Sequence, residues 1–102
     1  MTTVRFAAEG DTLWAYLCGE IDHDSARRLR LRIDEEAACR MPALLVLDLG
    51  GVGFMDSSGI GLILGRQRRM QALGGRVRVS RPPAAVQKVL RLAHIDDQEV
   101  LL

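Results

Sequence analysis

The sequence of 102 residues contains only two cysteines and two histidines, and this scarcity excludes several kinds of site. Two cysteines do not form the disulfide framework of a small secreted domain. Because Cys18 and Cys39 stand among apolar neighbours, we predict that both are buried in a reduced, cytoplasmic protein without a signal peptide. Neither His23 nor His94 has a Cys or His partner at metal-ligand spacing, so we predict no metal site.

Long apolar runs, repeats and a strong net charge are also missing. No apolar stretch reaches the roughly 20 residues of a membrane-spanning helix, so membrane insertion is not predicted. The formal net charge of +1 lacks the basic excess that indicates nucleic-acid binding. Without repeats, linkers or low-complexity tracts, residues 1–102 are predicted to form a single domain.

The spacing of apolar residues predicts strands that alternate with helices. Strands are expected over residues 2–8, 12–19, 43–49, 76–80 and, as a short last element, 99–102. Helices are expected from residue 22 or 24 to about 39, over 58–73, and after Pro82 and Pro83. This order predicts an α/β fold, with one mixed β-sheet of four to five strands covered by helices.

Arginine supplies nearly all of the positive charge, since Lys88 is the only lysine. Two arginine clusters, at residues 27–30 and 66–69, fall within predicted helices. We expect solvated helix faces there, with Arg66 and Arg69 directed away from the sheet. A phosphate-binding face is the less favoured interpretation, because acidic residues lie close by in the sequence.

The most distinctive stretch joins a predicted strand to a predicted helix and reads Phe-Met-Asp-Ser-Ser-Gly-Ile-Gly over residues 54–61. Helix starts leave backbone N–H groups unpaired and favour Asp, Ser and anions. One interpretation is therefore that Asp56 or Ser57 is a plain N-cap. A second serine exceeds the needs of one cap, and each glycine that follows weakens the helix by about 1 kcal/mol relative to alanine. These features favour a functional segment.

This segment, followed by Gly-Arg at 65–66, resembles the phosphorylation segment of the bacterial anti-sigma factor antagonists, which are small STAS-domain proteins. The resemblance continues upstream in Gly-Glu-Ile-Asp-His at 19–23, and downstream at 74–75 and 81–86. It covers nearly the whole chain in family order and implies a single STAS-type domain.

The resemblance implies an anti-sigma factor antagonist that has no enzyme activity and no cofactor. The unphosphorylated protein would bind an anti-sigma factor that is also a serine kinase, and this would release a sigma factor for transcription. Phosphorylation of Ser57 would end the complex, and a serine phosphatase would restore it. By the same match, the partner-binding residues are Asp56, Ser58, Gly59, Glu20, Asp22 and His23.

Two other functions remain open from the sequence. A STAS accessory subunit of a lipid-transport ATPase would use the same surface for a constitutive contact. A small serine hydrolase would need Ser57, His94 and an Asp brought together, but the Gly-x-Ser-x-Gly elbow is absent. No Gly-Lys-Ser/Thr motif supports nucleotide binding by this chain. We therefore predict no catalytic residue.

Overall fold

The structure is a computed structural model and describes residues 1–93, which form four strands and three helices in the order ββαβαβα. The strands are β1 (Thr3–Glu9), β2 (Thr12–Ile21), β3 (Leu44–Met55) and β4 (Arg76–Ser80). The helices are α1 (His23–Arg40), α2 (Ser57–Ala72) and α3 (Ala84–Leu92). The predicted order is confirmed, and the strand predicted at 99–102 lies outside the described residues.

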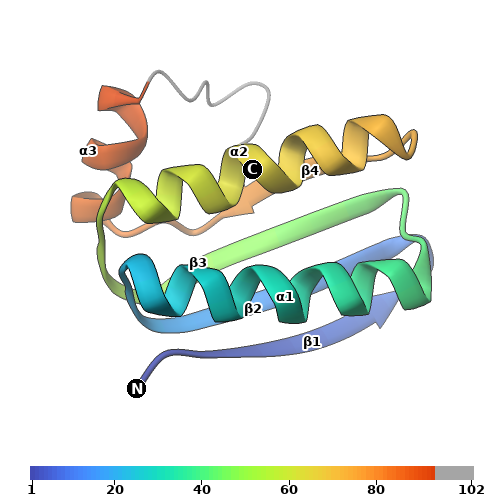
Figure 1. Cartoon of the computed structure of the whole chain (residues 1–102), viewed down its shortest axis with the longest axis horizontal. Helices are drawn as coiled ribbons and strands as arrows, with labels where there is room; N and C mark the ends of the chain where they lie inside the picture. Colours follow the sequence, from blue (N-terminus) through green and yellow to red (C-terminus); the bar gives the residue numbers. More distant parts are fainter. Residues whose placement is uncertain (94–102) are drawn as a thin grey trace.

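The four strands form one mixed sheet in the order β1-β2-β3-β4. β1 pairs antiparallel with β2, whereas β2–β3 and β3–β4 are parallel pairs. α1 and α2 each connect two parallel strands, and they lie side by side over one face of the sheet and begin at the same end (Figure 1). Right-handed crossovers in one direction along a sheet place both helices on that face. The segments before α1 and α2 therefore meet at one edge.

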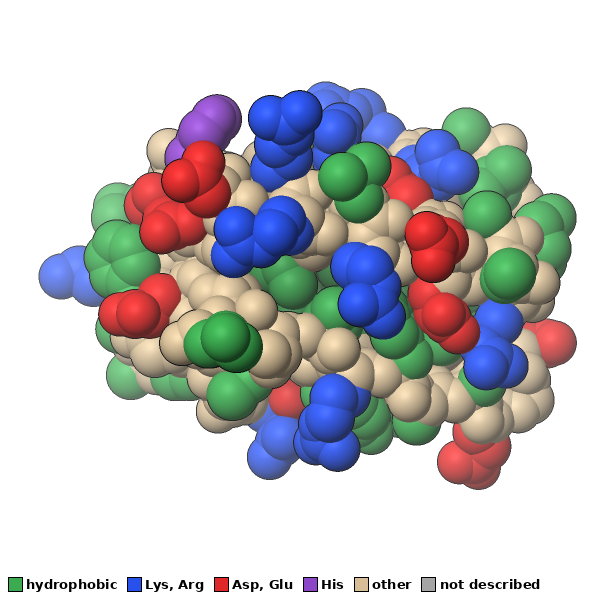
Figure 2. All heavy atoms as spheres, turned by 60° about the horizontal axis from the view of Figure 1, so that its bottom comes forward, with side chains coloured by type: hydrophobic (Ala, Val, Ile, Leu, Met, Phe, Trp, Pro, Cys, Tyr) green, Lys and Arg blue, Asp and Glu red, His purple; other side chains and the backbone are tan. Residues whose placement is uncertain are grey.

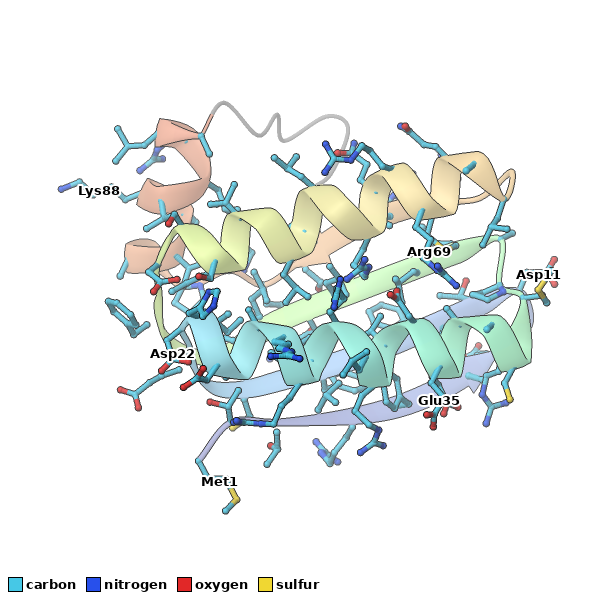
Figure 3. The ribbon with its side chains drawn as sticks, in the orientation of Figure 1. Met1, Asp11, Asp22, Glu35, Arg69 and Lys88 are labelled. Carbon is cyan, nitrogen blue, oxygen red and sulfur yellow. The ribbon has the colours of Figure 1, made fainter. Side chains whose placement is uncertain are left out.

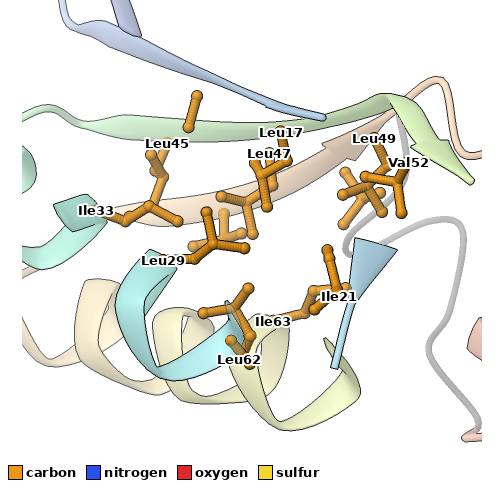
Figure 4. Close-up of a cluster of buried hydrophobic side chains, with 14 of the residues drawn as sticks. Leu17, Ile21, Leu29, Ile33, Leu45, Leu47, Leu49, Val52, Leu62 and Ile63 are labelled. Carbon is orange, nitrogen blue, oxygen red and sulfur yellow. The ribbon is translucent and has the colours of Figure 1, made fainter. Parts of the chain in front are cut away.

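The hydrophobic core fills the space between the sheet and these two helices. Figure 4 shows Leu45 and Leu47 of β3 on one side of it, with Leu29, Ile33 and Ile63 from the helices on the other. All five side chains are buried. Burying a side chain of this size contributes about 1.5–3 kcal/mol, so this layer fixes the helices, and hence their first residues, against the sheet.

Both cysteines are exposed, so the prediction that they are buried was wrong. Cys18 follows Leu17 in β2, and successive side chains of a strand point to opposite faces. Leu17 enters the core, which leaves Cys18 on the other face. Cys39 stands two residues after the buried Ala37 in α1, about 200° around the helix. Apolar neighbours in sequence therefore did not indicate burial at either position.

β3 continues past the predicted end at residue 49 as far as Met55. Gly50 and Gly51, which follow the predicted end, belong to the strand. Pairing with β2 continues up to Ile21 and Met55, with two register shifts on the way. The extension matters because it carries the chain in regular structure to the start of α2.

Arg66 is only 7% exposed, so the prediction that it faces solvent was wrong. Its Nε lies 2.9 Å from Oδ1 of Asp34 on α1, which places the guanidinium between the two helices. Arg69 is more exposed, as predicted, and reaches the same Asp34 oxygen at 3.6 Å (Figure 3). Tertiary packing of α1 against α2 decides which of these arginines is covered.

Asp48 in β3 is a buried carboxylate that the sequence did not single out. Oδ2 accepts a hydrogen bond from Nε of Arg81 at 2.9 Å, and Oδ1 accepts from Nη2 of Arg81 at 3.1 Å and from the Gly50 N–H at 3.0 Å. Burial raises the pKa of Asp48, but the hydrogen bonds from Arg81 and Gly50 outweigh it and leave the pKa below its ordinary value. The pair ties the middle of β3 to the segment before α3.

Asp48→Asn is expected to lower the free energy of unfolding by about 1–2 kcal/mol at pH 7, because it weakens two charge-assisted hydrogen bonds. The folded pKa of Asp48 lies below the unfolded value, so the carboxylate stabilises the fold above the unfolded pKa of about 3.9. This contribution is lost as the pH falls through the folded pKa. Urea unfolding should therefore separate the two proteins by more at pH 7 than at pH 3. An equal gap at both pH values would contradict the assignment.

Candidate functional site

Two loops meet at the edge of the sheet where α1 and α2 begin. β2 and β3 run parallel and end side by side, with Ile21 paired to Met55. The N–H of Asp56 donates to the carbonyl oxygen of Ile21 at 3.1 Å, which joins the start of α2 to the end of β2. Figure 3 shows Asp22 at the end of α1 where both helices begin. The fold thus brings two segments of sequence, residues 20–23 and 56–58, to one place.

Ser57 is the first residue of α2 and is exposed, which confirms the predicted position. The cap of this helix is Asp56, whose Oδ1 accepts from the N–H of Ser58 at 2.8 Å. Asp56 and Ser58 are half-buried, so of the three residues Ser57 presents most of its side chain to solvent. Because Asp56 supplies the cap, the Ser57 hydroxyl is left available for chemistry.

Asp22 caps α1 in the same manner, and a serine that sequence reasoning missed completes the motif. Oδ1 of Asp22 accepts from the N–H of Ser25 at 2.9 Å, while Oγ of Ser25 accepts from the N–H of Asp22 at 2.8 Å. These hydrogen bonds from Ser25 hold the pKa of Asp22 below its usual value. The three-residue spacing from Asp22 to Ser25 resembles that of a capping box and was the available signal. The loop before α1 is therefore held in one conformation, with an ionised carboxylate at the edge.

The other predicted residues of this loop, Glu20 and His23, are both exposed. The carbonyl oxygen of Glu20 accepts from the hydroxyls of Thr2 and Ser25, which fixes its backbone and leaves the carboxylate free to reach solvent. His23 is the first residue of α1. Both residues lie in the segment that the fold brings next to residues 56–58, and their contact with a partner stays a prediction.

Gly59 differs from the other predicted partner residues because it is buried. A Cβ at this position would overlap the side chain of Met55, which is itself buried. Because Gly59 is buried, a partner can reach little of it, and its contact with a partner stays a prediction. The glycine lets α2 pack closely over Met55 and so sets the position of Ser57, two residues earlier.

The described residues contain no group of three or more His, Cys, Asp or Glu side chains that could hold a metal ion. His94, the histidine considered for a hydrolase, lies outside the described residues. Among residues 1–93, no helix has the length and apolar character needed to cross a membrane.

Comparison with protein families assigns the fold. The model of the STAS domain matches residues 6–101, which is nearly the whole chain. The chain belongs to the STAS-domain family. This STAS domain is 34% identical to the anti-sigma F factor antagonist of Lysinibacillus sphaericus over 83 residues, or 81% of this chain and 71% of that protein. The predicted resemblance to anti-sigma factor antagonists is thus confirmed, and the antagonists of this family are not enzymes.

Solved structures of the anti-sigma factor antagonist SpoIIAA are similar to this STAS domain in both sequence and fold. Its unphosphorylated form is 27% identical with a TM-score of 0.83, covering 98% of this chain and 88% of the other. The phosphorylated form of the Bacillus protein is 26% identical with a TM-score of 0.76, covering 98% and 89%. One solved relative therefore exists in both phosphorylation states.

Proposed function

We propose that this STAS domain is a cytoplasmic anti-sigma factor antagonist that is switched by phosphorylation of Ser57. In its unphosphorylated form it binds an anti-sigma factor with serine kinase activity, and a sigma factor is thereby released. The kinase transfers phosphate from its own ATP to Ser57 and ends the complex, and a serine phosphatase reverses the modification. The chain itself contributes no catalytic group and needs no cofactor.

The observation that carries this proposal is the exposed Ser57 at a helix start whose capping is already performed by Asp56. A hydroxyl that is exposed and not needed for the cap can enter a kinase active site without unfolding the domain. The chain is also related to an antagonist known in a phosphorylated form. Both facts support phosphorylation at this serine in preference to a purely structural role.

The charges around Ser57 explain how phosphate would act. A phosphoserine carries about −1.5 to −2 charges at neutral pH. The carboxylates of Asp56, Glu20 and Asp22 belong to the same edge, so the added charge makes an already acidic surface more acidic. The N-terminus of α2 offsets part of this repulsion, which keeps the fold intact. The added charge therefore acts mainly on a partner that binds the unmodified surface, and it weakens that binding.

Incubation with the cognate kinase and ATP is expected to add one phosphate to the wild type and none to Ser57→Ala. Ser58→Ala is the matched control, because it removes the neighbouring hydroxyl, and it should still accept one phosphate. Intact-mass spectrometry measures all three. No phosphate on the wild type, in a mixture where the two proteins bind, would favour a constitutive STAS contact over a switch. Phosphate on Ser57→Ala would place the acceptor at another residue and contradict the assignment to Ser57.

A further inference from the structure

A groove of about 590 Å³ runs between α1 and α2, next to the candidate site. Ser58 and His23 line the part where the two helices begin. The rest of its wall carries four arginines from the two helices, Arg27, Arg30, Arg66 and Arg68. Figure 2 shows basic side chains gathered beside the histidine on this side of the molecule. No Asp or Glu of the described residues lines the groove.

Two glycines of α2, Gly61 and Gly65, also line the groove and leave it open. A Cβ at either position would meet no atom within 4 Å among the described residues, in contrast to Gly59, which packs on Met55. Glycine weakens a helix relative to alanine, so a glycine without a packing neighbour has no structural reason in the folded chain. Glycine does allow another molecule to approach the helix backbone closely. The floor of the groove thus has the form of a contact surface.

Three of the arginines that line the groove are not neutralised by an acidic side chain of the described residues. In the described part of the chain, Arg27, Arg30 and Arg68 form no ion pair. Each of the three is exposed, so their guanidinium groups are free to bind carboxylates. Five donors in a planar fork make arginine well suited to that role.

Arg66 at the base of the groove is also incompletely neutralised. Its Nε and Nη1 are buried and have no hydrogen-bond partner in the described residues, although Nε lies 2.9 Å from Asp34. Asp34 is shared with Arg69 at 3.6 Å, so one carboxylate serves two guanidinium groups. Burial lowers the pKa of Arg66, Asp34 raises it, and the charges of Arg30 and Arg69 lower it further. The groove therefore has an excess of positive charge that attracts an acidic group.

We propose that this groove binds an acidic peptide segment of the anti-sigma factor, an inference that rests on the proposed function. Carboxylates of the segment pair with Arg27, Arg30 and Arg68, and one of its apolar side chains lies over Gly61 and Gly65. Ala26 and Leu62, which also line the groove, supply the apolar contact.

The distribution of charge favours a peptide over a compact anion. From His23 to Arg30 the lining of α1 extends about 10 Å, and from Ser58 to Arg68 the lining of α2 extends about 15 Å. A single phosphate is too small to reach arginines spread over such a length. A peptide that begins at Ser58 follows the groove away from Ser57, so one partner can occupy both places.

The test is calorimetric titration of the anti-sigma factor into the full chain with Arg27→Ala and Arg30→Ala combined. We expect affinity to fall about tenfold at low salt, and less at high salt, where surface charges are screened. The matched control combines Arg28→Ala and Arg32→Ala, which removes two charges from α1 outside the groove. The control should bind within about twofold of the wild type. Equal losses in both pairs, or none in the groove pair, would overturn the proposal.

A second variant tests the floor of the groove without changing charge. Gly61→Leu places a side chain into the open space and should lower the affinity for the anti-sigma factor about tenfold. Circular dichroism should show that the domain stays folded. Titration with tripolyphosphate tests the alternative that the groove binds phosphate and not an acidic peptide. If it shifts the Gly61 and Gly65 amide resonances at micromolar concentration while Gly61→Leu binds the anti-sigma factor normally, the groove takes phosphate and the proposal is wrong.

Failure of this inference differs from failure of the proposed function. If the groove variants bind the anti-sigma factor normally and phosphorylation of Ser57 abolishes binding, only the groove proposal is refuted. If the wild-type protein binds no anti-sigma factor, the proposed function on which the inference rests is refuted.

Discussion

Ser57→Asp is expected to bind the anti-sigma factor roughly ten- to a hundredfold more weakly than the wild type, and phosphorylated Ser57 more weakly still. Two unit charges a few ångströms apart at an interface interact by about 1 to 4 kcal/mol, depending on how much water is excluded. A loss near the middle of that range corresponds to this change in affinity. Aspartate supplies one charge on a smaller, planar group, so it reproduces only part of the phosphate effect.

Gln71→Asp is the matched control for this prediction. Gln71 is also exposed on α2, but it lies near the opposite end of the helix from Ser57. The added charge is the same, so this variant should keep wild-type affinity in the same calorimetric titration. The free energy of unfolding of Ser57→Asp should lie within about 1 kcal/mol of the wild-type value, because the residue is exposed and is not the cap. Equal affinities for wild type, Ser57→Asp and the phosphorylated protein would leave Ser57 as part of a helix start only.

Gly59→Ala is expected to lower the free energy of unfolding by about 1–2 kcal/mol, although alanine is the better helix former. The new methyl group would overlap the Met55 side chain and come within 3.4 Å of Ile21. Overpacking of this kind costs about 1–3 kcal/mol and exceeds the gain of about 1 kcal/mol in helix propensity. Chemical denaturation of the purified domain measures the difference.

Gly65→Ala provides the comparison, because a Cβ there would meet no atom within 4 Å of the described chain. It should stabilise the domain by about 0.5–1 kcal/mol through helix propensity alone. Combining Gly59→Ala with Met55→Ala should cost less than the sum of the two single changes, because the truncated side chain makes room for the methyl group. If Gly59→Ala is as stable as Gly65→Ala, Met55 does not constrain the start of α2.

Much of the fold and the position of the candidate serine followed from local sequence patterns. The period of the apolar residues predicted the order of the seven described elements, because helix and strand periodicity are properties of short windows. The Asp-Ser-Ser segment between a strand and a helix predicted an exposed serine at a helix start, since capping depends on only a few neighbouring residues. The proximity of Glu20 and Asp22 to Ser57, in contrast, came from the family resemblance.

Contacts between distant residues were decided by tertiary structure alone. Arg81 reaches Asp48 across 33 residues of sequence, and no local pattern marks that pair. Arg66 is buried because α1 brings Asp34 over it, and the exposed Cys18 follows from which face of β2 the helices cover. The groove exists because two parallel helices begin at the same edge of the sheet. Sequence periodicity fixes which face of an element is apolar, whereas only packing fixes which elements share that face and which charges then lie side by side.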